Sequence, residues 1–227
     1  MSSGPVQGAL DALLADPRVW RGSDGTDKPA ALASGYPDLD RALGGGWPLG
    51  VVCELALSET GCGELSLLLP ALCRLQGPIA LIAPPHVPYP RAMAAAGVTS
   101  SRLLLIEGVD PLQAQWAAEQ TLRSGACAAV LLWLPTIGTR AVRRLQLAAE
   151  AGNAFMVVLL PLAGSPAHSS AALRLRLSPV LRGVAVRVRK RRGAWPSSAP
   201  LIVEYPSGVV AGPGVAGTGA GGAADGG

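Results

Sequence analysis

The sequence predicts an α/β protein with a mainly parallel central sheet and a C-terminal antiparallel extension. Short continuous apolar runs alternate with segments of helical periodicity, as in a sheet that is covered by helices on both faces. Hydrophobic residues make up 49% of the 227 residues, with one Phe and three Tyr, so the core must be mainly aliphatic. From residue 184 the pattern changes to strict alternation, which is typical of a half-exposed strand.

The chain is expected to form one domain with tails, because 227 residues are enough to bury a single core. Residues 1–30 are predicted to form a short helix (5–15) and a polar linker. The domain is predicted to span 31–206. Residues 207–227 are rich in Gly and Ala without periodicity, and we expect them to be disordered.

Strands are predicted where apolar runs of about five residues are bounded by Gly, Pro or polar residues, and helices where Pro, Gly and helical spacing mark both ends. The predicted strands are 51–55, 79–83, 103–106, 128–134 and 155–160. The predicted helices are 37–43, 64–75, 91–96, 111–124 and 139–151. In the C-terminal part, 184–192 is predicted to pair with 201–205.

Cysteine usage and hydropathy favour a cytoplasmic protein. The four cysteines include no C-x-x-C pair and three lie in apolar stretches, so buried free thiols are expected and no metal site. No apolar run of about 18 residues is free of charge and proline, which argues against a membrane span. The N-terminus lacks the basic and apolar regions of a signal peptide. The cysteines are Cys53, Cys62, Cys73 and Cys127.

The positive charge lies in the C-terminal third. Residues 1–150 carry 11 basic and 13 acidic side chains, whereas 151–227 carry 8 and 2, and all eight of these basic residues fall within 174–192. One interpretation is a patch for single-stranded DNA or an acidic partner surface. The other is a solvated edge strand protected from aggregation by its charge. The residues of this basic strip are Arg187, Arg189, Lys190, Arg191 and Arg192.

Residues 50–69 have the strand–loop–helix layout of a phosphate-binding loop. Such a loop needs a Lys and a Ser or Thr directly after its last glycine, for the phosphates and for Mg²⁺. Here Gly61 and Gly63 are followed by Glu64 and Leu65. A carboxylate repels phosphate and Leu cannot bind a metal, although Glu64 is favourable at a helix N-terminus. The sequence therefore predicts a degenerate loop without a nucleotide cofactor or a metal.

Three segments carry a resemblance to a known family. They are S-G-Y-P-D-L-D-R-A-L-G-G-G-W-P-L-G (34–50), L-I-A-P-P-H (81–86) and L-R-S-G-A-C-A-A-V-L-L-W (122–133). In this order and at this spacing they resemble the RecA superfamily, and within it the ImuA/SulA-like group of bacterial SOS-response proteins. The resemblance spans about 32–205 and implies a RecA-like three-layer sandwich.

The chain departs from RecA at each catalytic position. The resemblance places the loop lysine of RecA at Glu64 and its neighbouring hydroxyl residue at Leu65. The glutamate that activates water falls at Pro85, and the aspartate at a strand end falls at Trp133. Each loss removes a separate part of the ATPase machinery, so we expect no ATPase activity.

The segments G-G-G-W-P-L-G, I-A-P-P-H-V-P-Y and W-A-A-E-Q-T-L-R-S-G-A-C favour ImuA. That resemblance implies a non-catalytic adaptor in SOS-induced translesion DNA synthesis. The implied partners are an ImuB-type inactive Y-family polymerase homologue, an error-prone polymerase III alpha-type subunit, RecA and single-stranded DNA. One alternative is a SulA-type cell division inhibitor that binds FtsZ. Another is a divergent ATPase.

Three further residues have expected roles. Trp133 is expected to fill the vacated nucleotide site as a core residue, with a partner-facing position as the alternative. Trp116 lies in a predicted helix and is expected to belong to the core. Glu54 is expected to pack or to form hydrogen bonds, and not to act in catalysis.

Overall fold

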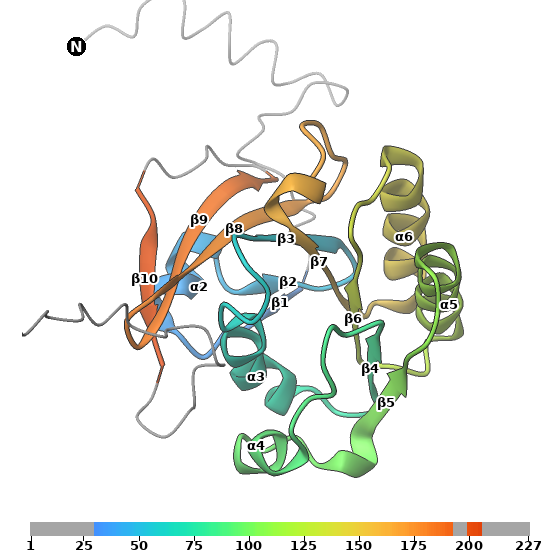
Figure 1. The fold of residues 1–227 in the computed structure, drawn as a ribbon, viewed down its shortest axis with the longest axis horizontal. Helices are drawn as coiled ribbons and strands as arrows, with labels where there is room; N and C mark the ends of the chain where they lie inside the picture. The colour runs from blue at the N-terminus through green and yellow to red at the C-terminus, as the bar shows by residue number, and fades with distance from the viewer. Residues whose placement is uncertain (1–29, 193–198, 206–227) are drawn as a thin grey trace, which may run out of the picture.

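The computed structural model describes residues 30–192 and 199–205. In this part of the chain, strands form an eight-stranded sheet in the order β10-β9-β8-β3-β7-β6-β4-β5, with helices on both faces (Figure 1). The six strands from β8 to β5 are parallel, and β9 and β10 are antiparallel. The predicted fold class is confirmed. The predicted helix 5–15 and the predicted disordered tail 207–227 lie outside the described residues.

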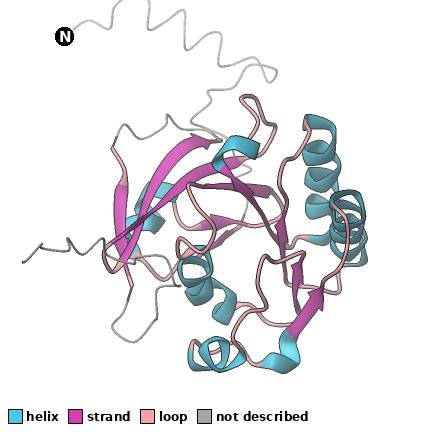
Figure 2. Ribbon diagram, viewed as in Figure 1, coloured by secondary structure: helices cyan, strands magenta, loops and turns pink. Residues whose placement is uncertain are grey.

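The observed elements follow the predicted ones closely (Figure 2). The helices are α2 (Pro37–Leu43), α3 (Glu64–Arg74), α4 (Pro90–Ala95), α5 (Pro111–Ser124) and α6 (Thr139–Gly152), with 3-10 turns η1 (Ser100–Arg102) and η2 (Leu162–Gly164). The sheet strands are β3 (Val52–Leu57), β4 (Ile79–Ile82), β5 (Leu103–Ile106), β6 (Ala129–Trp133), β7 (Phe155–Pro161), β8 (Leu173–Val180), β9 (Gly183–Arg191) and β10 (Leu201–Glu204). A separate two-stranded sheet joins β1 (Ala31–Leu32) and β2 (Trp47–Pro48).

The sheet separates two hydrophobic cores. Because side chains of a strand alternate between its two faces, Leu55 packs toward α2 and α3, whereas Val52, three residues earlier, packs toward α6. The first core also contains Trp47, whose ring centroid lies 5.7 Å from that of Phe155. The second core is formed with small and branched residues of α5 and α6, among them Ala114, Ala118, Leu122, Val142 and Leu145.

Helix α5 shows why some boundaries could be predicted to the residue. Asp110 accepts hydrogen bonds from the backbone N–H groups of Leu112 and Gln113, and the Gln113 side chain accepts one from the backbone N–H of Asp110. This capping box satisfies groups that a helix N-terminus leaves unpaired. Pro111 begins the helix, and Gly125 ends it in the left-handed conformation.

Strand β8 was not predicted, and it lies beside β9, the strand that carries most of the basic strip. Its sequence alternates, with Leu173, Leu175 and Leu177 buried in the first core. The strand lies between β3 and β9, and β10 pairs with the other side of β9. β10 pairs only with residues 183–186, so among the described residues the basic part of β9 from Arg187 onward is paired on the β8 side alone, and its interpretation as an edge strand stays a prediction. The predicted pairing of 184–192 with 201–205 is confirmed by the antiparallel β9–β10 ladder.

The thiols behave as predicted. All four cysteines are free, and Cys53, Cys62 and Cys127 are buried. Within residues 30–192 and 199–205, no cluster of three or more His, Cys, Asp or Glu side chains could hold a metal ion. No helix in those ranges has the length and apolar character that crossing a membrane requires.

Replacement of Leu177 by Ala tests whether the antiparallel extension belongs to the same cooperative core. Leu177 is 0% exposed, so Leu177→Ala should lower the free energy of unfolding by about 2–5 kcal/mol, because it leaves a cavity in the core. Leu181→Ala is the matched control, since that side chain is 84% exposed. Urea titrations followed by circular dichroism measure both. Equal stability of the two variants would show that β8 packs loosely.

Candidate functional site

The degenerate phosphate-binding loop lies between the carboxyl end of β3 and the first turn of α3. Gly63 caps the helix with φ 96°, and Glu64 is the first helical residue. The backbone N–H of Gly61 donates a hydrogen bond of 3.3 Å to Glu64 Oε1, and the Glu64 side chain is buried. In a working loop, N–H groups at this position bind phosphate. Here the carboxylate of the chain itself receives one of them.

The C-terminal extension closes the same loop. The Tyr205 hydroxyl donates a hydrogen bond of 2.7 Å to the Gly63 carbonyl, and burial raises the pKa of Tyr205 above its ordinary value. A Cβ atom at Gly63 would collide with the Tyr205 ring, so only glycine fits there. Tyr205 was not predicted, because the contact spans 142 positions of the chain and no local pattern indicates it.

The other two altered ATPase positions line a cleft. Pro85 and Trp133 contribute to a cavity of about 340 Å³ at the carboxyl ends of β3, β6 and β7. This is the end of an open α/β sheet where ligands usually bind. No lining residue is charged, so the cleft offers no cation to a triphosphate. The full lining is Leu57, Thr60, Ala83, Pro85, Val109, Pro111, Trp133, Leu134, Pro135, Leu159, Leu160 and Pro161.

Trp133 is 8% exposed and packs in the first core, which confirms the expected core position. It fills only part of the vacated space, since the cleft remains beside it. Leu65 is half-buried and packs against the same core. The predicted site residues Gly61, Gly63, Glu64, Leu65, Pro85 and Trp133 therefore all lie at the carboxyl end of the sheet.

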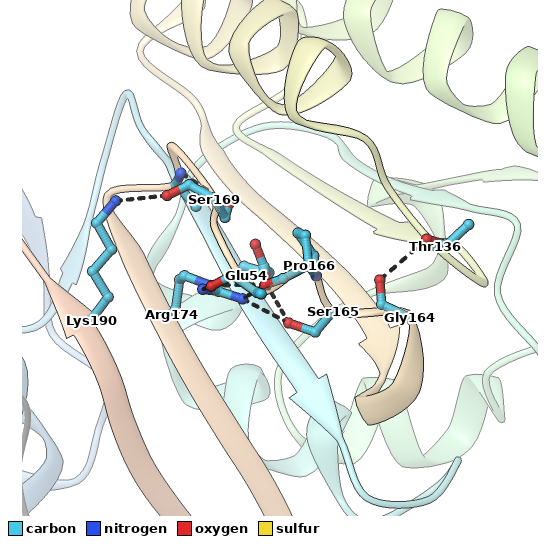
Figure 3. A network of polar contacts seen from close by, with 10 residues as sticks. Glu54, Thr136, Gly164, Ser165, Pro166, Ser169, Arg174 and Lys190 are labelled. Carbon is cyan, nitrogen blue, oxygen red and sulfur yellow. Dashed lines mark hydrogen bonds and ion pairs between the residues drawn. The ribbon is translucent and has the colours of Figure 1, made fainter.

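Glu54 has the structural role that was predicted (Figure 3). Arg174 donates to Glu54 Oε1 through Nε at 3.0 Å and Nη2 at 2.9 Å, and Ser165 Oγ donates to the same oxygen at 2.6 Å. Arg174 also donates to the carbonyl of Pro166. A buried carboxylate is costly without such partners. The network ties the segment after β7 to β3 and β8.

The structure divides the basic strip into bound and free side chains. Lys190 Nζ donates to the Ser169 carbonyl at 2.9 Å, and Arg191 Nη1 donates to the Ala42 carbonyl at 3.2 Å. Arg187, Arg189 and Arg192 are exposed. These three side chains have no ion pair or hydrogen-bond partner among the described residues. Two members of the basic strip are thus held by hydrogen bonds to the chain, and the role of the strip in binding a partner or DNA stays a prediction.

Large apolar side chains are exposed on α5 and in the segment after β4. Trp116 is 62% exposed and Leu112, one turn earlier on α5, is 77% exposed. The expectation that Trp116 belongs to the core is wrong, because no described element covers this face of α5. Val87 and Tyr89 are also exposed, and they follow β4, the neighbour of β5. Pro85 and Pro111, which line the cleft, precede these exposed residues in the sequence: the first comes two residues before Val87, and the second directly before Leu112.

Comparison with known proteins gives the family. The family model described as "Cell division inhibitor SulA" matches residues 50–156. A protein of that name from Edwardsiella piscicida is 35% identical over 122 residues, which are 50% of this chain and 73% of the relative. The chain belongs to the SulA family. The SulA of Yersinia enterocolitica is 33% identical over 116 residues, covering 50% of this chain and 69% of the relative. The SulA of Yersinia pestis (strain Pestoides F) is 30% identical over 135 residues, covering 58% and 80%.

The match to SulA has a clear structural extent. Residues 50–156 contain the loop, the exposed apolar residues and most of the cleft lining, whereas β8, β9 and β10 lie beyond them. The matched relatives are named as cell division inhibitors. Of the resemblance to the ImuA/SulA-like group, these matches confirm the relationship to SulA.

The thiol of Cys62 gives a test of the closed loop. Burial, and then the Glu64 carboxylate, raise its pKa from 9.0 to about 12. The folded state therefore holds this proton more tightly, and its contribution to stability is present below pH 9.0 and is lost as the pH rises toward 12. Between about pH 9 and 10, wild type should lose about 1 kcal/mol more unfolding free energy than Cys62→Ala. Urea titrations at both pH values measure this difference. Rapid alkylation of Cys62 in the native protein at pH 8 would contradict a buried thiol.

Proposed function

We propose that this SulA-family protein is a non-catalytic inhibitor of cell division that acts in the cytoplasm by binding FtsZ. The family match supports this function, since the relatives carry the name of cell division inhibitors. The observation that carries it is the exposure of large apolar side chains on α5 and in the segment after β4, in sequence next to residues that line the cleft and within the matched residues. No part of the proposed action needs a nucleotide cycle.

The candidate docking surface consists of Val87, Tyr89, Leu112 and Trp116 with the adjoining cleft. Exposed apolar clusters of this kind are typical of protein–protein contact sites. Trp and Tyr are enriched among the residues that dominate binding energy. The uncharged cleft provides a recess in which an apolar side chain of the partner is excluded from water. Binding without turnover then blocks the partner in proportion to the amount of inhibitor.

A second candidate function is the adaptor role in translesion DNA synthesis. It is supported by the glycine-rich segment 34–50, which resembles ImuA and lies outside the matched residues 50–156 except for its last residue. In that role the partners would be an ImuB-type polymerase homologue, a polymerase III alpha-type subunit and RecA. The same apolar surface would serve as the docking site.

Affinity purification from DNA-damaged host cells separates the two functions. The tagged full chain should recover FtsZ, identified by mass spectrometry, if the protein is a division inhibitor. Recovery of an inactive Y-family polymerase homologue without FtsZ would contradict the division role and establish the adaptor. Expression in the host should also give filamentous cells under the first function only.

The docking surface is tested by Leu112→Ala combined with Trp116→Ala. If both residues are central to the interface, each should cost about 2 kcal/mol or more, so the double variant should bind FtsZ at least several hundredfold more weakly. Leu147→Ala on α6 is the control, because Leu147 is 58% exposed but lies away from the cleft. Biolayer interferometry measures the affinities. Unchanged affinity in the double variant would place the interface elsewhere.

A further inference from the structure

One face of the C-terminal strands β8, β9 and β10 is not covered by any helix of the described residues. In β8 and β9, the buried side chains Leu175, Leu177, Val186 and Val188 point toward the first core. The intervening residues therefore point to the opposite face. On that face α5 and α6 lie over β3, β4 and β6, and not over β9 and β10, which form the opposite edge of the sheet (Figure 1).

Three arginines on this uncovered face are exposed: Arg176, Arg187 and Arg189. Two other basic groups on the same strands have partners, since Arg174 is bound to Glu54 and Lys190 to the Ser169 carbonyl. The three exposed guanidinium groups have neither an ion pair nor a hydrogen-bond partner among the described residues. We call them the arginine face.

The arrangement of the arginine face concentrates positive charge. Arg176 and Arg187 are direct cross-strand partners in the β8–β9 ladder. Like charges in this position repel each other and destabilise a sheet. The register shift between Arg174 and Leu175 leaves Arg189 as the extra residue of β9 beside them. Glu204, on the neighbouring strand β10, pairs in register with Gly183 at the far end of β9.

We propose that the arginine face binds the phosphodiester backbone of nucleic acid. A guanidinium group presents a planar fork of donors that matches two phosphate oxygens. Arg187 and Arg189 repeat along an extended strand at about 6.8 Å, and Arg176 lies one strand away at about 4.8 Å. Three guanidinium groups therefore lie on one face of the sheet, where successive phosphates of a flexible nucleic acid chain can bind them. The bound anion would also remove the repulsion between Arg176 and Arg187.

The composition of the face favours a polyanion whose binding is wholly electrostatic. Between Arg176 and Arg189, β8 and β9 contribute no aromatic residue, so bases have no stacking platform. The other residues of β8 and β9 on this face are Ser178, Val180, Gly183 and Ala185, and β10 adds Ile202 and Glu204 beside Ala185 and Gly183, away from the three arginines. A stable protein interface needs a more apolar centre. Sequence-independent, salt-sensitive binding of nucleic acid follows from these properties, and it is separate from the docking surface around the cleft.

Fluorescence anisotropy of labelled oligothymidylate and of a labelled DNA duplex tests the proposal with the full chain. Three phosphate contacts predict a slope of log K against log salt of about −2 for the single strand and about −3 for the duplex. The form of DNA that binds with the higher affinity at equal salt concentration, single strand or duplex, is the one that the arginine face prefers. In Arg187→Ala combined with Arg189→Ala, the single-strand slope should fall in magnitude to about 0.7.

Two further variants keep the result interpretable. Arg91→Ala combined with Arg140→Ala removes the same charge from exposed positions on α4 and α6 and should bind like wild type. Arg187→Lys combined with Arg189→Lys keeps the charge and should retain the slope. The proposal would be overturned by equal losses of DNA affinity in both alanine variants, or by no loss of affinity in Arg187→Ala combined with Arg189→Ala. Binding of polyglutamate with no binding of either DNA would also overturn it and assign the face to an acidic protein.

Discussion

The burial of β3 on both faces and along both sides is the constraint on which the rest of the structure depends. All six of its residues are buried, including Glu54. A carboxylate in such a position requires a partner, and Arg174 on β8 provides it. The parallel part of the sheet and the antiparallel extension are therefore joined by a charged interaction as well as by the β3–β8 ladder. Loss of the C-terminal strands would remove the Arg174 cation and leave only the Ser165 hydroxyl as a partner of the central carboxylate.

The same strand leads into the loop whose chemistry has changed. Where a RecA-type ATPase binds phosphate, this chain places Glu64 against the loop backbone and Tyr205 against Gly63. The neighbouring cleft is lined without any charge. Under the proposed function, the exposed apolar side chains of α5 and of the segment after β4 bind the partner, and the altered loop needs no ligand.

The sequence predicted those features that depend on local chemistry. The bounds of α5 were predicted because Pro111 and Gly125 mark its ends. The degenerate loop was predicted because the missing lysine and hydroxyl are adjacent in sequence. In contrast, β8 was not predicted, because its alternation of leucine and arginine covers only residues 173–177 and is followed by Pro179, a residue that argues against a strand inside a sheet. The Glu54–Arg174 pair and the Tyr205–Gly63 contact join residues 120 and 142 positions apart, which a single sequence does not reveal. Trp116 was placed in the core because a helical pattern does not show whether another element covers its face.

The most direct test of the account is the effect of the purified protein on FtsZ assembly in GTP, followed by light scattering with and without ATP. The account predicts that assembly is suppressed at about one inhibitor per FtsZ, and to the same extent whether or not ATP is present. Normal FtsZ assembly at excess protein, or suppression that requires ATP, would contradict a non-catalytic inhibitor that acts by binding.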